Sequence, residues 1–174
     1  MRLEGTFTNG AVELVGSNNG PFSSVMQACY PYLLSDLSLL LNMLQDLRKE
    51  LSGVAATARR HGYTLAKIEA AEKAISELRG SSLTRDHLVA QLRSVLRKLG
   101  GVGDDLVSSP DTVAEHGFKL QHVDLTAQLL SSTIVAAALE ADFDPLTMAR
   151  LQNLRACCKQ ALSGNAAPMV AFNA

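Results

Sequence analysis

Residues 33–58 read LLSDLSLLLNMLQDLRKELSGVAATA, and we expect this stretch to organise the fold. Its apolar residues recur at alternating steps of four and three, which places them along one side of a helix. Polar residues such as Asp36, Asp46 and Glu50 fall on the other side, so we expect that side to face water. The pattern predicts one long amphipathic helix over residues 33–60. Its apolar positions are Leu33, Leu37, Leu40, Leu44, Leu47, Leu51, Val54 and Ala58.

The composition favours helices packed on helices. The chain has 174 residues, of which 47% are hydrophobic and only 5% are aromatic, and it has no Trp. A chain of this length typically forms one domain with a substantial core. Because that core must come mainly from Leu, Val and Ala, an all-α fold is the natural expectation.

Signals for further helices follow along the chain. Thr64 and Thr84 are favourable N-caps, and Tyr63 and Ile68 are spaced to pack across the first turn of the helix that Thr64 would begin. Gly62 suits the left-handed conformation that ends a preceding helix. We therefore expect helices over residues 64–79, 84–99, 109–141 and 144–163, with a loop over residues 101–108.

The first residues predict a β-hairpin. Two short apolar runs within residues 1–15 flank Asn9-Gly10, a dipeptide that readily supplies the positive φ angles of a tight turn. We divide the chain into a hairpin and connection over residues 1–24, a helical bundle over residues 25–164 and a tail over residues 165–174. The expected fold is thus an all-α bundle of about five helices with a small N-terminal β-hairpin.

The net charge and the cysteine content indicate which partners and which cellular compartment to expect. The net charge of −1 argues against a generally basic nucleic-acid binder. The three cysteines, Cys29, Cys157 and Cys158, show no Cys-x-x-Cys spacing, which favours a reducing compartment. No apolar run approaches the roughly 18 residues that a membrane span requires. We expect a cytoplasmic protein.

The most suggestive polar pattern lies in the helix expected over residues 109–141. That helix carries two apolar faces, and a polar ribbon of Gln121, Asp124, Gln128 and Ser131 runs between them. Asp124 and Gln128 are one helical turn apart, so the carboxylate and the amide lie side by side. Such a pair can orient a water molecule or hold a metal-bound phosphoryl group. We take these four residues as the candidate binding site.

Residues 124–128, Asp-Leu-Thr-Ala-Gln, resemble the Asp-Leu-Thr-Gly-Gln signature of the helical-hairpin phosphatases that dephosphorylate chemotaxis response regulators. The resemblance implies that Gln128 positions the attacking water and that Asp124 pairs with a lysine of the regulator. It covers five residues, and Ala127 stands where that family has Gly. The long hairpin and the acidic C-terminal tail of that family are not evident in this chain.

Two other patterns suggest activities of different classes. His116 and Lys119 have the His-x-x-Lys spacing of histidine phosphotransfer helices, although Leu120 replaces the Gly of those proteins. The helices expected over residues 64–79 and 84–99 resemble a helix-turn-helix, with the basic residues Arg93, Arg97 and Lys98 on the second helix. A surface histidine and a solvated basic strip are the favoured explanations of these two patterns. His122 falls on an apolar face, where a buried, hydrogen-bonded histidine is expected.

Motifs for metal binding and nucleophilic catalysis are missing from the sequence. It contains no Cys-x₂-Cys, no His-x₃-His and no Gly-x-Ser-x-Gly, so we predict no metal, no cofactor and no catalytic residue. We expect a non-enzymatic regulatory or protein-interaction module that acts through a helical surface. The alternative is a phosphatase or phosphotransfer partner of a response regulator that uses Asp124 and Gln128.

A protein partner or a homodimer is the expected assembly, and neither a membrane nor nucleic acid is expected to bind. The apolar side of residues 33–58 is longer than the helices expected over residues 64–79 and 84–99 can cover. A second copy of the chain would cover the excess, or else the helix expected over residues 109–141 would cover it within the same chain and leave a monomer.

Overall fold

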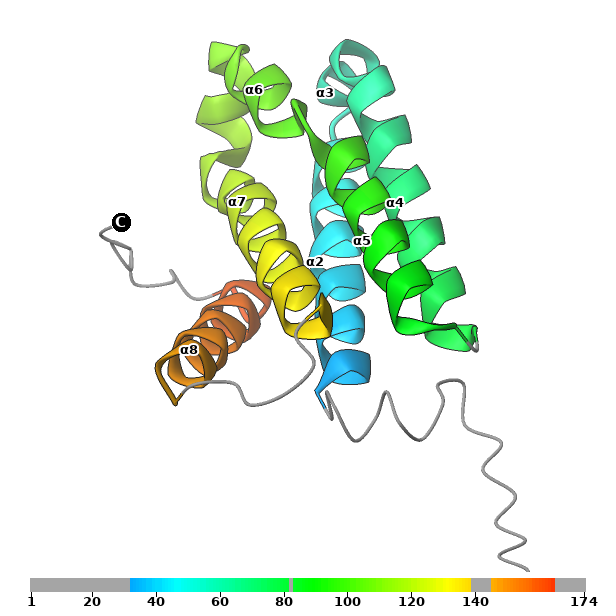
Figure 1. The fold of residues 1–174 in the computed structure, drawn as a ribbon. Coiled ribbons are helices and arrows are strands. Elements are labelled where there is room, and N and C mark those ends of the chain that lie inside the picture. Colours follow the sequence, from blue (N-terminus) through cyan, green and yellow to red (C-terminus); the bar gives the residue numbers. More distant parts are fainter. Residues whose placement is uncertain (1–31, 82, 139–144, 165–174) are drawn as a thin grey trace, which may run out of the picture.

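The computed structural model describes residues 32–81, 83–138 and 145–164, and every regular element in these ranges is a helix (Figure 1). The all-α prediction is therefore confirmed for this part of the chain. The predicted hairpin over residues 1–15, its connection and the tail over residues 165–174 lie outside the described residues. The helices are α2 (Leu33–Gly53), α3 (Ala55–Arg60), α4 (Gly62–Gly80), α5 (Arg85–Leu99), α6 (Val102–Val107), α7 (Pro110–Ala138) and α8 (Pro145–Leu162).

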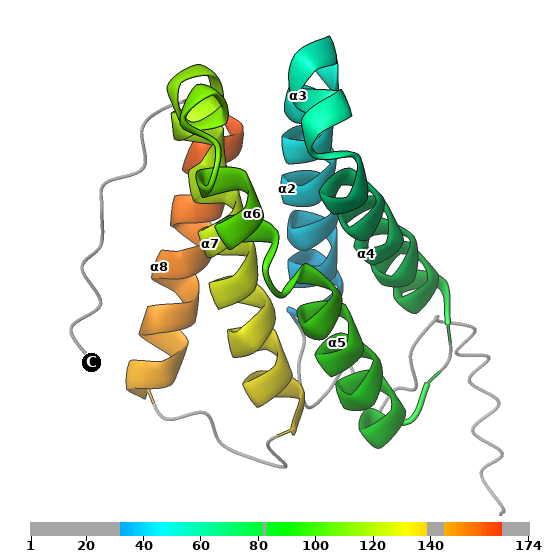
Figure 2. The same cartoon turned by 90° about the horizontal axis from the view of Figure 1, so that it is seen from above.

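The long helices α2, α4, α5 and α7 form an antiparallel four-helix bundle in which each helix packs against the next and α7 closes the ring on α2 (Figure 1). The fifth long helix, α8, lies outside this ring against α7 and α2. Figure 2 shows it beside α7, on the side of the molecule away from α4. The short helix α6 packs against α7 and α4. The five long helices correspond to the five that the sequence predicts.

The apolar side of α2 forms the centre of the core, as predicted. Leu37, Leu40 and Leu51 are fully buried, and Leu33, Leu44 and Leu47 are at most 3% exposed. Burying each such side chain contributes roughly 1.5–3 kcal/mol relative to leaving it in water. Helices α4, α7 and α8 of the same chain supply the neighbours, so this side of α2 is covered without a second copy.

The prediction of a single helix over residues 33–60 is wrong, because the helix is interrupted near its C-terminal end. Helix α2 ends at Gly53, Val54 has an extended backbone (φ −105°, ψ 111°), and α3 begins at Ala55. Glycine is a poor helix former, which makes this a weak point in the helix. Beyond the break Thr57 is fully buried, whereas Val54 and Ala58 are only half-buried.

The prediction that Asp36 faces water is also wrong. Asp36 is fully buried, and Arg155 of α8 donates to both of its carboxylate oxygens, from Nε at 2.6 Å and from Nη2 at 2.8 Å. The ring of Tyr32 lies over the same guanidinium at 4.6 Å. A buried carboxylate is stable only with such partners. This ion pair attaches α8 to the start of α2.

The start of α4 differs from the prediction. The helix begins at Gly62, so Thr64 lies within the first turn and is not an N-cap. Tyr63 is 78% exposed and does not pack on Ile68. Gly62 does not adopt a positive φ angle, unlike Gly101 and Gly164. The hydroxyl of Thr64 instead donates to Asp105 of α6, a contact that sequence spacing does not reveal.

Other helix ends agree with the sequence, and one loop does not. Thr84 caps α5 by accepting a hydrogen bond from the backbone N–H of His87, and the predicted apolar side of α5 is buried. Helix α7 continues through Gly117 without a break. The loop predicted over residues 101–108 contains the helix α6, whose Val102 and Leu106 are buried in the core.

Candidate functional site

The predicted polar ribbon lies on the surface of α7. Gln121, Asp124 and Ser131 are exposed and Gln128 is half-buried. The Gln128 Nε2 donates a hydrogen bond of 2.6 Å to the Asp124 Oδ2, so the amide and the carboxylate are adjacent as the spacing predicts. The ribbon is therefore accessible to a partner along its whole length.

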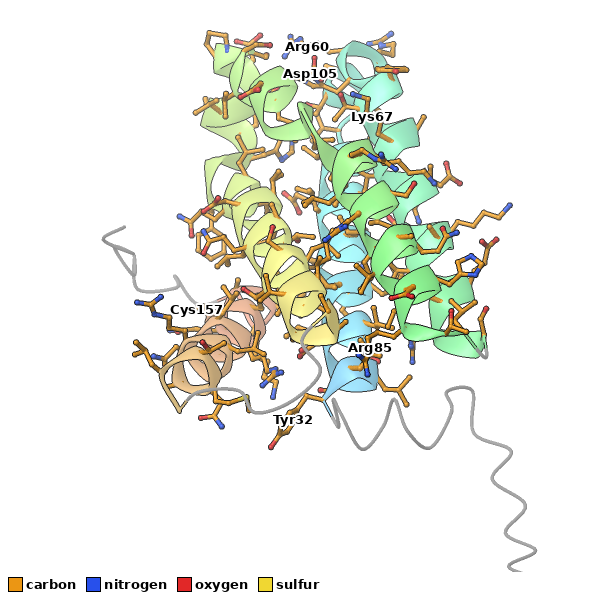
Figure 3. The ribbon with its side chains drawn as sticks, viewed as in Figure 1. Tyr32, Arg60, Lys67, Arg85, Asp105 and Cys157 are labelled. Carbon is orange, nitrogen blue, oxygen red and sulfur yellow. The ribbon has the colours of Figure 1, made fainter. Side chains whose placement is uncertain are left out.

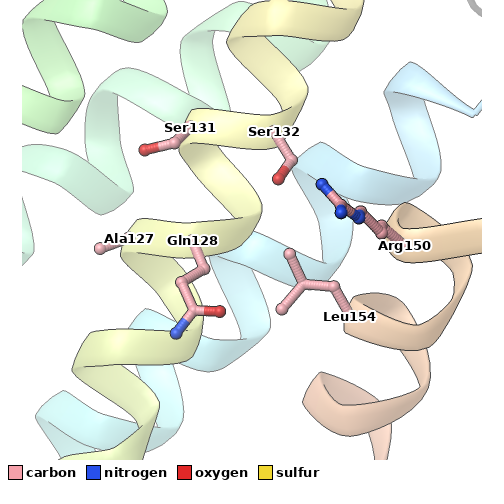
Figure 4. A pocket seen from close by; sticks show the side chains of 6 residues that line it. All are labelled: Ala127, Gln128, Ser131, Ser132, Arg150 and Leu154. Atoms are coloured by element: carbon pink, nitrogen blue, oxygen red, sulfur yellow. The ribbon is translucent and has the colours of Figure 1, made fainter. Parts of the chain in front are cut away.

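A pocket of about 430 Å³ lies where this ribbon meets α8 (Figure 4). Gln128 and Ser131 of the predicted site line it, whereas Gln121 and Asp124 do not. Sequence reasoning missed the other residues of the pocket. They are Ala127 and Ser132 from α7 and Arg150 and Leu154 from α8.

The polar part of the pocket consists of hydrogen-bond donors and one positive charge. Gln128, Ser131 and Ser132 provide an amide and two hydroxyls, and Figure 4 shows the Arg150 guanidinium extending from α8 toward α7 on the side of Ser132. Arg150 is exposed, and within the described part of the chain it has no ion pair. Helix α8 contains no Asp or Glu, so nothing in its own helix offsets this charge.

His116 does not have the environment of a phosphoacceptor. Its ring is 3% exposed, with Nδ1 3.3 Å from the Glu50 Oε1 and Nε2 3.3 Å from the Thr57 Oγ1. Lys119, one turn away, donates to the Asp46 Oδ2 at 2.6 Å. Because both side chains are occupied between α2 and α7, the geometry does not support a phosphotransfer site here.

His122 is fully buried, as predicted, but its ring lacks the predicted hydrogen bonds. Neither ring nitrogen has a hydrogen-bond partner among the residues described. The Nδ1 lies 3.3 Å from the Asp46 Oδ2, out of line for a hydrogen bond. Burial lowers the pKa of His122, and the neighbouring charge of Lys119 lowers it further. This histidine is neutral in the folded protein near pH 7.

A second polar cluster, which the sequence does not suggest, lies at the end of the bundle where α3, α4, α6 and α7 meet. His61 is 3% exposed, with Nδ1 2.8 Å from the Asp105 Oδ2 and Nε2 2.9 Å from the Thr112 Oγ1. Arg60 donates to Ser109 at 2.8 Å, and Figure 3 shows Arg60 and Asp105 at this end of the molecule. The hydrogen bonds from Thr64 and His61 lower the pKa of Asp105. These contacts join four helices.

Among the described residues, the cysteines and the acidic residues do not form a reactive centre. Cys157 and Cys158 are buried and free, and burial raises the pKa of Cys158 to about 12, so its thiol stays protonated. Across the described ranges, no cluster of three or more His, Cys, Asp or Glu residues is arranged to hold a metal ion.

The helix-turn-helix interpretation does not fit the arrangement of α4 and α5. These helices lie side by side as an antiparallel bundle pair, whereas the two helices of that motif cross at a steep angle (Figures 1 and 2). Arg93, Arg97 and Lys98 are exposed on α5. In the described residues, no helix is both long and apolar enough to cross a membrane.

Comparison with models of protein families, with curated proteins and with solved structures finds no match for this chain. The resemblance to the chemotaxis phosphatases therefore remains limited to residues 124–128. Any assignment of function rests on the geometry of the pocket and its surroundings.

Proposed function

We propose that the protein is a non-enzymatic regulatory module of the cytoplasm that docks a protein partner on the surface between α7 and α8. The supporting observation is the pocket of about 430 Å³ in which Gln128 and Ser131 meet Arg150. Its size is that of typical recognition pockets, which are about 300–1,000 Å³. The described residues of its lining offer hydrogen-bond donors and a positive charge, and among them there is no carboxylate, histidine or cysteine for proton transfer or nucleophilic attack.

The proposal is tested by cross-linking and capture from a lysate of the native host, using three forms of the chain. Arg150→Glu reverses the charge in the pocket and is expected to remove the partner that the unmodified chain retains. Arg93→Glu, an equal charge reversal on the exposed side of α5, is the matched control and is expected to retain it. Equal capture by both variants would place the docking surface elsewhere.

A homodimer remains a second proposal for the assembly. The apolar side of α2, which motivated it, is covered by α4, α7 and α8 of the same chain, so a dimer would use another surface. Sedimentation at micromolar concentration decides the matter. A single species at the chain mass of 18.6 kDa would rule the homodimer out at that concentration.

The alternative proposal is a phosphatase or phosphotransfer partner of a response regulator that uses Asp124 and Gln128. It is supported by the adjacency of these two exposed or half-exposed groups and by Gln128 reaching a pocket that contains Arg150. The test is the decay of the aspartyl-phosphate on a purified receiver domain. Acceleration by the unmodified chain, lost in Gln128→Ala, would favour this alternative, whereas unchanged decay would remove it.

A further inference from the structure

We propose that the pocket between α7 and α8 is a carboxylate-binding site that receives one Glu or Asp side chain of a docking partner. This inference rests on the proposed function, since it names the chemistry that the docking surface recognises. It follows from the charge, the donors and the apolar floor of the pocket.

The first argument is the match between Arg150 and a carboxylate. A guanidinium presents parallel N–H groups that fit the two oxygens of a carboxylate, and the resulting hydrogen bonds are stronger than those between neutral groups. Arg150 has no internal acid to satisfy it in the described part of the chain. Ser132 of α7 lines the same pocket, and its hydroxyl can rotate to donate a further hydrogen bond to the ligand (Figure 4).

The second argument concerns the size of the ligand charge. Arg150 is the one charged residue among the described residues of the lining, and its single positive charge matches one negative charge on a ligand. A phosphoryl group carries about −1.5 to −2 near pH 7, which one arginine does not neutralise. Asp124, hydrogen-bonded to Gln128 at the edge of the pocket, adds a negative charge that repels a dianion more than a monoanion. A carboxylate is therefore the better fit.

The third argument is that the pocket is held in shape before a ligand arrives. Leu151 and Leu154 of α8 are at most 4% exposed, and the buried pair of Arg155 and Asp36 fixes the same helix to α2. Ala127 and Leu154 form an apolar surface against which the methylene groups of a Glu side chain can pack. A preformed site loses less entropy when it binds.

The test is a titration of the ¹⁵N-labelled full chain, followed by NMR in low salt. The probe is N-acetyl-glutamate methylamide, and N-acetyl-glutamine methylamide is its neutral isostere. We expect the glutamate probe to shift the Gln128 side-chain amide and the backbone signals of Ser131 and Ser132, and the glutamine probe to leave them unchanged. Arg150→Gln is expected to weaken the binding of the glutamate probe about tenfold.

Matched variants make the result specific. Lys159→Gln removes the same charge from another exposed position on α8, outside the pocket lining, and is expected to bind the probe as the unmodified chain does. Ser132→Ala, which keeps the charge, is expected to weaken binding less than Arg150→Gln. The NMR spectrum of each variant verifies that it is folded.

Three results would overturn the inference. They are equal shifts from both probes, no shift from either, or tighter binding of N-acetyl-phosphoserine methylamide than of the glutamate probe, which would assign the pocket to phosphoryl groups. If the glutamate probe binds but no partner is captured through Arg150, the carboxylate site stands and the proposed docking function fails.

Discussion

The two halves of the bundle are stabilised by different interactions, one by apolar packing and the other by polar contacts. In the apolar half, the first part of α2 packs against the last part of α7 through leucines and other aliphatic residues. In the polar half, the end of α2, α3 and the first part of α7 meet through buried histidines, threonines and their acidic neighbours. The apolar half includes Leu37, Leu40, Leu44, Leu129, Leu130 and Ile134, and the polar half includes Asp46, Glu50, Thr57, Thr112, His116 and His122.

The difference shows which contacts depend on geometry. Apolar burial is non-directional, so any side chain of suitable size on the correct side of a helix contributes to it. A buried polar group contributes only if a partner stands at the correct distance and angle, and otherwise it costs stability. His116 meets that condition with Glu50 and Thr57, whereas His122 does not.

The largest expected effect comes from the buried ion pair of Asp36 and Arg155 in the apolar half. Arg155→Ala removes the guanidinium that holds the fully buried carboxylate of Asp36, and it should cost about 3–5 kcal/mol of unfolding free energy. Urea unfolding followed by circular dichroism measures this loss. The double variant Asp36→Leu, Arg155→Met removes both charges and should recover most of the stability. A cost below about 1 kcal/mol for the single change would show that the pair does not attach α8.

Leu44→Ala is the next largest test, and it addresses packing alone. Leu44 is 1% exposed in the middle of α2, so truncating it should cost about 2–5 kcal/mol through lost burial and a residual cavity. The same urea titration measures it, with Asn42→Ala on the exposed side of α2 as the control. A loss similar to that of the control would mean that this side of α2 is not the core.

A pH titration distinguishes the two halves through His122. Because burial lowers its folded pKa from the usual 6.5, the unfolded chain takes up the proton first as the pH falls. The neutral His122 ring contributes its full share to the free energy of unfolding above pH 6.5. This contribution is lost as the pH falls from 6.5 through the lowered pKa of the folded protein. His122→Leu should therefore lose less stability on acidification through this range than the unmodified chain. Asp46, Glu50 and Lys119, whose charges act on the ring, remain in this variant.

The control for this titration is His87→Gln, because His87 is exposed on α5. It should leave the pH dependence of stability unchanged. If the stability of His122→Leu depends on pH as that of the unmodified chain does, the buried ring does not contribute to acid sensitivity. Other groups of the polar half would then cause the loss of stability at low pH.

The smallest expected effect is at the rim of the polar half. Asp111 is 72% exposed and accepts from the Arg60 Nη2 at 2.9 Å. Asp111→Asn should cost less than about 0.5 kcal/mol, because exposed ion pairs are screened by water and salt. Thermal unfolding at low and high salt measures the difference. A loss above about 2 kcal/mol would show that this contact, despite its exposure, organises the cluster around Arg60.

Two of the six described residues that line the pocket were predicted from the sequence. Gln128 and Ser131 follow from the polar ribbon of α7, because residues three and four apart on a helix share a face. Arg150 and Leu154 were not identified as pocket residues, because no local pattern states which part of α8 lies against α7, and Ser132 was missed because the side of α7 that meets α8 depends on the same packing. The pair of Asp124 and Gln128 forms as predicted, yet Asp124 does not line the pocket.

The sequence by itself determined the helices and most of their buried sides. Leucine spacing, the cap at Thr84 and the glycines Gly101 and Gly164 are local features, and local backbone chemistry decides them. Only the tertiary structure decided the break between Gly53 and Ala55, the burial of Asp36 against a residue 119 positions away and the pocket on α8. The physical reason is that a polar side chain takes its role from its partner, and partners distant in sequence meet only when the helices pack.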